Sequence, residues 1–355
     1  MTRTLLAALI ATLMAGAAQA SEDFTLRYAP GIGGADMSAP LEGGWVIQTP
    51  VFSYRAHIDH GQVVSTPLQP LGAPIPSTAT TQINTRINVG VDAVLPRLTW
   101  MGQGKFLGAQ VGFTAMLPLM RQKAAVSVQS VATTVSPAGV GLEGVGALVN
   151  AGATASAKAL ALANSNAATG AGDLELAPVL RWSTENSQWL FVPAVILPTG
   201  KYDGRHTANP GAGEYLSFRP LVQYSYIGDG WDLGTRASFA INGTNAKTHF
   251  RTGNYLNLDT ALLKSLSDAW RVGVAGYAVV QTTPDKITVT PTDPALAARL
   301  GVTNGLKGRV FGLGPELAYI KGAGDYELDG RLVREFGAQD RPQGTAFWIN
   351  LSLPL

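Results

Sequence analysis

The stretch QINTRINVGVDAVL, which runs from Gln82 to Leu95, decides the fold of this chain. Its odd positions are apolar apart from one threonine, whereas its even positions include three amides and two opposite charges. Successive side chains of a strand point to opposite faces, so the pattern predicts a two-faced β-strand. A tilted strand needs about 9–11 residues to cross a membrane, and this stretch is long enough. We expect the apolar face to meet lipid and the polar face to line a lumen, although a soluble sandwich with its apolar face inward fits the same pattern.

Comparable alternation recurs along the chain and predicts about twelve strands, an even number as in bacterial outer-membrane barrels. The connections alternate between long and short, which is typical of barrels with short periplasmic turns and long extracellular loops. The predicted class is therefore an all-β, transmembrane antiparallel β-barrel. The expected strands are 45–56, 82–100, 105–119, 172–183, 188–198, 214–227, 231–242, 254–264, 270–282, 309–320, 326–336 and 345–355.

Composition supports this class. Only 14% of the 355 residues are charged and the mean hydropathy is +0.13, whereas soluble domains carry about a quarter charged residues. The absence of cysteine excludes disulfides and thiolate metal sites. With a formal net charge of +2 and no basic run, nucleic-acid binding has no electrostatic basis.

The segments outside the strands divide the chain. Residues 1–20 resemble a cleaved signal peptide, with Arg3, a short apolar core and the small-x-small sequence Ala18-Gln19-Ala20, although an N-terminal anchor helix is the alternative. Residues 21–44 are rich in glycine and proline and form either a disordered leader or a plug inside the lumen. The barrel spans 45–355. Within it, 57–80 is expected to be a loop, 101–104 a tight turn, and 124–171 a long loop insertion with a helical turn or two.

Tryptophan gives an independent indication of a membrane. Trp prefers the membrane–water interface, because its ring is apolar and its N–H needs a partner. Of the seven tryptophans, only Trp348 lies beside a predicted long loop. The alternative to an interfacial girdle is that the tryptophans fill a core near the turns. The predicted aromatic girdle beside the short turns consists of Trp45, Trp100, Trp182, Trp189, Trp231 and Trp270.

Two further sets of residues are candidates for function. Polar residues on strands are expected to face the lumen, either pairing with one another or contacting solute. These are Asn84, Arg86, Asn88, Asp92, Glu175, Arg181, Asp232, Arg236, Arg309, Glu316, Arg331 and Asn350. Prolines in the middle of three successive strands remove ladder hydrogen bonds. These prolines are Pro178, Pro193 and Pro220. They mark either tolerated bulges or a lateral seam, that is, a weak line in the wall through which apolar solutes leave sideways into lipid.

The chain shows no signature of an enzyme, a metal site or a cofactor. The string Gly139-x-Gly141-x-x-Gly144 lacks the surrounding βαβ unit of a dinucleotide site. No G-x-S-x-G string occurs. His57-x-x-His60 has no identifiable further ligand.

Several motifs nevertheless resemble one family. They are Val91-Asp92-Ala93-Val94-Leu95-Pro96-Arg97 with Leu117-Pro118-Leu119, Gly172-Asp173-Leu174, Leu197-Pro198-Thr199-Gly200-Lys201-Tyr202-Asp203, Gly230-Trp231-Asp232-Leu233, and Phe336-Gly337-Ala338-Gln339-Asp340-Arg341-Pro342 with Phe347-Trp348. Together they resemble the outer-membrane proteins of the meta-pathway of phenol degradation, a family related in type to long-chain fatty-acid and toluene channels. The resemblance covers nearly all of the mature chain except 124–171. It implies passive uptake of aromatic or other hydrophobic compounds, and it carries no established site residues.

We therefore predict an outer-membrane channel of a Gram-negative bacterium that passes small hydrophobic solutes by diffusion, with the lipid bilayer as its partner. An outer-membrane barrel enzyme and a structural or adhesive barrel are the alternatives. A histidine-based enzyme would need His57, His60, His206 or His249. The solute, the pore width and the oligomeric state stay open.

Overall fold

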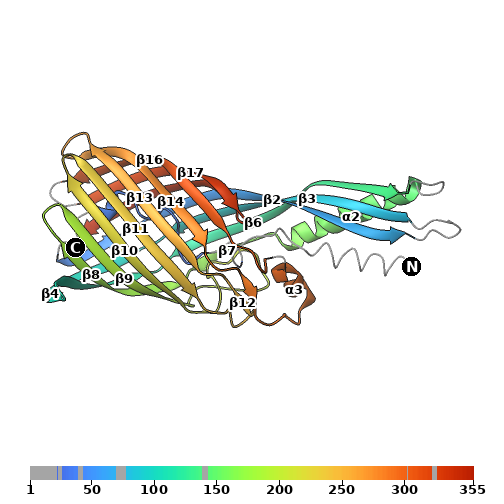
Figure 1. The fold of residues 1–355 in the computed structure, drawn as a ribbon, viewed down its shortest axis with the longest axis horizontal. Helices are drawn as coiled ribbons and strands as arrows, with labels where there is room; N and C mark the ends of the chain where they lie inside the picture. Colours follow the sequence, from blue (N-terminus) through green and yellow to red (C-terminus); the bar gives the residue numbers. More distant parts are fainter. Residues whose placement is uncertain are drawn as a thin grey trace.

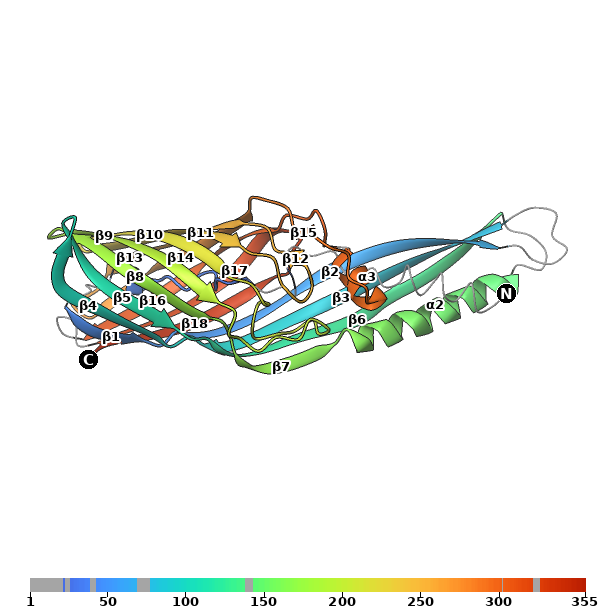
Figure 2. The same cartoon turned by 90° about the horizontal axis from the view of Figure 1, so that it is seen from below.

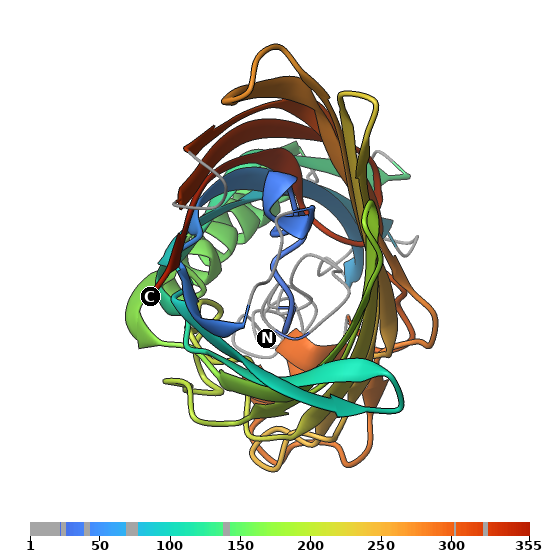
Figure 3. The ribbon, with the colours of Figure 1, turned by 90° about the vertical axis from the view of Figure 1, so that its left-hand side faces the viewer.

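The computed structural model describes residues 22, 26–38, 43–68, 77–137, 143–301, 303–321 and 326–355. Within these residues the chain forms a closed antiparallel barrel of twelve strands (Figures 1 and 3), so the predicted fold class is confirmed. The predicted leader, 1–20, lies outside the described residues.

The barrel wall follows the order of the chain and closes where β18 pairs with β1 and β2. Four of its twelve strands are made of two consecutive segments, namely β1 with β2, β3 with β4, β5 with β6, and β7 with β8. The elements are β1 (Gly44–Gln48), β2 (Val51–Leu68), β3 (Ser77–Val94), β4 (Arg97–Phe106), β5 (Ala109–Met116), β6 (Leu119–Ser136), α2 (Glu143–Ala163), β7 (Asn166–Ala171), β8 (Leu174–Ser183), β9 (Ser187–Leu197), β10 (Ser217–Gly228), β11 (Trp231–Asn242), β12 (Phe250–Arg251), β13 (Tyr255–Ser265), β14 (Trp270–Gln281), β15 (Lys286–Ile287), α3 (Pro294–Gly301), β16 (Arg309–Lys321), β17 (Tyr326–Gln339), β18 (Gln343–Pro354) and the short helix η2 (Ala35–Met37).

A line of breaks crosses the four two-segment strands. Three breaks fall at Pro50, Pro96 and Pro118, and the fourth falls at Gly172. Proline has no N–H to give to the ladder, so it interrupts a strand. Backbone hydrogen bonds still join the broken strands, with Leu95 N–H donating to Pro50 O at 2.8 Å and Gly172 N–H donating to Pro118 O at 2.7 Å. Hydrogen bonds therefore join the wall across this line, although each strand is broken there. The breaks at Pro50 and Pro96 fall inside stretches that were predicted as unbroken strands.

An arm extends beyond the barrel (Figures 1 and 2). It consists of the outer halves of β2, β3 and β6, with α2 packed on them through Val64, Ile83, Ala153 and Ala157. By length and composition, Gly144–Ala163 is the one helix among the described residues that is apolar enough to cross a membrane, and here it lies along the arm.

The structure corrects three loop predictions, two of them in the arm. Residues 57–68 continue strand β2, residues 101–104 belong to β4, and 124–171 contains most of β6, helix α2 and β7 instead of a loop. The turn after β4 falls at Leu107 and Gly108, both at positive φ. Residues 124–171 are rich in Ser, Thr, Gly and Ala, whose local preferences do not distinguish an extended strand from a loop.

The outer surface of the barrel carries an apolar band. The six tryptophans of the predicted girdle are all 36–50% exposed and lie near the short turns. Trp45 pairs with Trp100 across two strands at a ring distance of 6.4 Å. Trp348 is fully buried inside the barrel, stacked on Phe52. Large apolar side chains are also exposed on the outer face of other strands, among them Phe218 on β10, Leu258 on β13, Val274 on β14, Leu317 on β16 and Leu332 on β17.

Candidate functional site: a divided lumen

The N-terminal segment, residues 26–38, lies inside the barrel (Figure 3). Tyr28 and Ile32 belong to the largest apolar cluster together with Trp348 of the wall. Met37 is fully buried against β13, β14 and β16 side chains. These residues are part of 21–44, which the sequence analysis described as a disordered leader or a plug.

Charged side chains of the wall hold this segment by its backbone. Arg331 donates from Nε to Gly31 O at 3.0 Å and from Nη2 to Ile32 O at 2.7 Å. Glu316, which pairs with Arg331 at 3.2 Å, accepts the N–H of Ala35 at 2.7 Å. Because these charges are paired and hydrogen-bonded, burying them is tolerated, whereas losing one partner would be costly.

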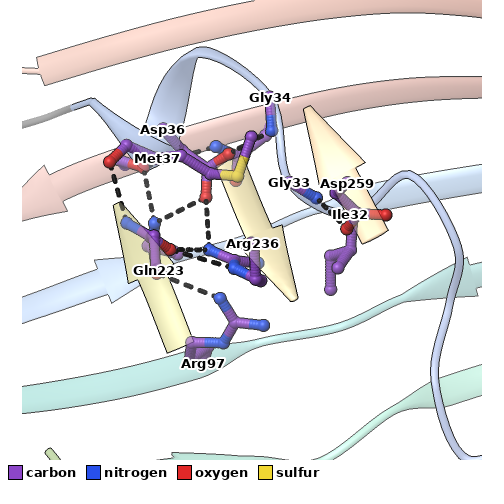
Figure 4. Close-up of polar contacts among 12 residues, drawn as sticks. Ile32, Gly33, Gly34, Asp36, Met37, Arg97, Gln223, Arg236 and Asp259 are labelled. Atoms are coloured by element: carbon purple, nitrogen blue, oxygen red, sulfur yellow. Dashed lines mark hydrogen bonds and ion pairs between the residues drawn. The ribbon is translucent and has the colours of Figure 1, made fainter. Parts of the chain in front are cut away.

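A second set of wall residues fixes the two ends of the segment. Asp259 accepts the N–H groups of Gly31 at 3.0 Å and Gly33 at 3.2 Å, and also the hydroxyl of Tyr28. At the other end, the carbonyl of Met37 accepts a hydrogen bond from Gln223 Nε2 at 2.8 Å (Figure 4).

An apolar cavity of about 140 Å³ lies between the segment and the wall formed by β2, β3, β5 and β6. Val91, Ala93 and Leu95 of the opening stretch line it, with Phe52, Met116 and Met120 from neighbouring strands. Among its polar lining residues, Glu335 accepts the hydroxyls of Tyr54 at 2.7 Å and Tyr277 at 2.8 Å. The other charged and amide side chains of the lining are Arg27, Gln122, Asp173, Glu175 and Arg341. This cavity suits a small apolar molecule that carries few polar groups.

A polar cavity of about 70 Å³ lies closer to the tryptophan girdle. Three arginines, Arg97, Arg219 and Arg236, line it together with the carboxylates of Asp36 and Glu175. Tyr28 and Glu175 line both cavities, so the two are neighbours along the lumen.

Most of the polar residues predicted for the lumen do lie inside it. Glu175, Asp232, Arg236, Glu316, Arg331 and Asn350 are buried, and Arg181 is half-buried with bonds to Gln110 and Gln188. Nearly all are paired within the protein: Glu175 with Arg219, Asp232 with Arg271, Arg236 with Gln223, and Glu316 with Arg331. Their pairing shapes the lumen and holds the N-terminal segment.

The remaining predicted lumen residues are on the outside, and the prediction for them was wrong. Arg86 pairs with Asp59 at 2.7 Å and Asp92 with Arg55 at 2.8 Å, with all four side chains at least 40% exposed. The odd positions of β3 face inward instead, because they line the apolar cavity and pack against the N-terminal segment and α2. The misplaced residues are Asn84, Arg86, Asn88 and Asp92 on β3, and Arg309, which is exposed at the start of β16.

The proline row consists of Pro178, Pro193 and Pro220, which the structure places side by side. Pro193 registers directly with Pro220, and Pro178 stands opposite Phe113 on β5. The β8–β9 ladder has no registered pairs between Leu176 and Leu180. The inner side of this wall, at Val179, Val192 and Leu221, lines the polar cavity.

Sequence reasoning missed two features of the site. It did not identify Asp259 as a partner of the N-terminal segment, although an acid in a predicted strand was a signal. It also passed over the lumen side of Arg97, which ends one of the motifs that carry the family resemblance.

Comparisons with known proteins agree with this architecture. The COG4313 outer membrane channel from Pseudomonas putida F1 has a similar solved structure, with 13% identity, a TM-score of 0.56, and coverage of 93% of this chain and 100% of that one. A monoaromatic hydrocarbon channel, CymD, reaches 7% identity and a TM-score of 0.39 over 93% of this chain and 95% of that one. The outer membrane protein Omp33 of Acinetobacter baumannii has 8% identity and a TM-score of 0.31, with coverage of 89% of this chain and 99% of that one. No curated protein sequence matches. Residues 74–351 match a family model described as "Putative MetA-pathway of phenol degradation", and the chain belongs to that family.

Proposed function

We propose that this protein is a channel for the passive uptake of small hydrophobic, single-ring aromatic compounds across the outer membrane. The observation that carries the proposal is the apolar cavity of about 140 Å³ between the N-terminal segment and the wall. An apolar protein cavity of ~150 Å³ takes up benzene, so this cavity is of the size of one aromatic ring. The family description, which refers to phenol degradation, supports the same class of solute.

In this proposal the N-terminal segment acts as a plug that narrows the lumen, and the solute passes between it and the wall. Twelve strands leave little free interior once side chains fill it, so wide pores for bulk polar solutes are disfavoured. Transport follows the concentration gradient and needs no cofactor. The leader, 1–20, would be cleaved on export to the outer membrane.

Filling the cavity tests the proposal. Ala93 points into the cavity, whereas its neighbour Val94 points outward and is exposed. Ala93→Phe should lower the flux of toluene and phenol into proteoliposomes by at least about tenfold, because a phenyl ring would occupy the space that the solute needs. Val94→Phe adds a similar side chain to the lipid-facing side and should leave the flux unchanged.

The same assay separates the alternatives. If wild-type proteoliposomes take up no more toluene or phenol than empty liposomes, the channel proposal is wrong and a structural or adhesive barrel is favoured. Hydrolytic activity lost on combined substitution of the four histidines would instead favour a barrel enzyme.

A further inference from the structure

The polar cavity contains one arginine without a counter-ion. Arg219 forms an ion pair with Glu175. Arg236 lies 3.8 Å from Asp36 and donates two hydrogen bonds to Gln223. Among the described residues, Arg97 makes no ion pair. The three arginines and two carboxylates of the lining therefore leave one positive charge unpaired.

The contacts of Arg97 are weak ones. Its Nη1 lies 3.5 Å from Gln48 Oε1, and its Nη2 lies 3.6 Å from Met116 Sδ. The distance to Gln48 lies beyond the usual 2.7–3.2 Å range for a hydrogen bond from nitrogen to oxygen, and the thioether sulfur of Met116 is a weak acceptor. In Figure 4 the guanidinium group lies below the cluster that Asp36, Gln223 and Arg236 form, and a single dashed line reaches it. Arg97 thus keeps donors available inside a partly buried cavity.

A partly buried charge without a partner is unfavourable, and an anion that supplies the partner is bound in return. The planar guanidinium group matches a carboxylate, with two parallel N–H donors for its two oxygens. The other charged groups of the lining, Asp36 and Glu175, already have arginine partners. Their repulsion of an incoming anion is therefore offset.

The position of Arg97 beside the apolar cavity also indicates which kind of group the rest of the ligand carries. Met116, whose sulfur touches Arg97, lines the apolar cavity on its other side. A planar ring in the apolar cavity can thus lie next to a group that contacts Arg97. Since Tyr28 and Glu175 border both cavities, no strand of the barrel wall lies between these two positions.

We propose that Arg97 forms a carboxylate subsite, which receives the anionic group of an aromatic carboxylate at the junction of the apolar and polar cavities. The inference rests on the proposed uptake function and names a solute subclass within it. It gives the channel a preference for aromatic acids over hydrocarbons of the same size. The neutral ring is held by the apolar cavity and the carboxylate by Arg97.

The test compares benzoate with toluene and benzyl alcohol, using the full-length protein in proteoliposomes near neutral pH. Arg97→Gln should reduce benzoate flux about tenfold and leave the flux of both neutral solutes within about twofold. Arg97→Lys, which keeps the charge, should retain most of the benzoate flux. Lys105→Gln is the matched control, because Lys105 lies on the same strand but is exposed near the turn after β4. All variants should keep the heat-dependent gel mobility of a folded barrel.

Equal benzoate flux through wild type and Arg97→Gln would overturn the subsite while leaving the uptake function intact. If wild type passes none of the three solutes, the uptake function fails, and equilibrium dialysis of benzoate with the detergent-solubilised protein then decides the subsite alone. Saturable binding that Arg97→Gln removes would support it, and equal or absent binding would refute it.

Discussion

Gly34 of the N-terminal segment has no room for a side chain. A Cβ atom there would lie 1.7 Å from Nη1 of Arg331 and 2.3 Å from Oε1 of Glu316, whereas ordinary contacts begin at 3.4 Å. Both charged side chains are completely buried and paired with each other. Gly34→Ala must therefore move the segment away from the wall or separate the ion pair.

The structure sets the size of this effect. Displacement of the segment breaks three hydrogen bonds, from Arg331 to Gly31 O and to Ile32 O and from Ala35 N–H to Glu316. Hydrogen bonds to charged groups contribute about 1.5–3 kcal/mol each. A combined loss of at least about 4.5 kcal/mol would shift the equilibrium between docked and displaced segment by more than a thousandfold.

The absence of cysteine allows a direct assay. Met37→Cys introduces a single thiol at a position that is fully buried in the docked segment. Gly34→Ala should raise its rate of maleimide labelling at least tenfold and should increase single-channel conductance in planar bilayers. Gly104→Ala is the control, because a Cβ at Gly104 meets nothing within 4 Å. An unchanged labelling rate in a folded Gly34→Ala barrel would refute the reasoning that wall charges hold the segment.

Three further predictions concern the wall and the arm. Replacing the proline row with valine should leave toluene flux unchanged, because the row backs onto the polar cavity, and a clear fall would support a lateral seam instead. Leu258→Arg, on the lipid-facing side of β13, should lower the free energy of unfolding, measured by urea unfolding from vesicles, by about 2–4 kcal/mol. Val63→Arg on the exposed arm is the control and should change this free energy little. Equal effects of the two substitutions would contradict the membrane placement. Burial lowers the pKa of His60 on the arm below its usual 6.5, so the unfolded arm gains the proton first and stability is lost as pH falls below about 6.5. Hydrogen-exchange protection of α2 should accordingly decrease on acidification, and this decrease should be smaller in His60→Gln.

The barrel itself was predictable, because alternation and sorted connections follow from the two faces of a membrane strand. The four strand breaks were harder to predict from the sequence, because Pro96 and Pro118 fall within runs whose apolar pattern continues on both sides. The arm was missed because parts of its strands, such as 77–81 and 130–136, are rich in Ser and Thr, and only pairing with neighbours makes them extended.

Alternation alone could not predict which face of a strand points into the barrel. Val91 and Ala93 are as apolar as a lipid-facing residue, yet they line a cavity. Arg55 and Asp92 satisfy each other on the outer surface, so a charged pair can occupy the face that alternation assigned to the lumen. The pattern shows that two faces differ, and only closure of the barrel shows which one is inside.

The two cavities place opposing demands on a solute. Burying roughly 100 Å² of ring surface at about 25 cal/mol per Å² stabilises a bound ring by about 2.5 kcal/mol, which slows its release into water by between ten- and a hundredfold. A pure hydrocarbon gains nothing from Arg97, whereas an aromatic carboxylate contacts Arg97 with its anionic group while its ring lies in the apolar cavity. An apolar cavity that holds solute well would therefore transport slowly unless the polar cavity beside it draws the solute onward. The unpaired Arg97 and the apolar cavity are thus two halves of one path, and substitution of Arg97 should lower the flux of aromatic acids because the channel then captures the anion less well.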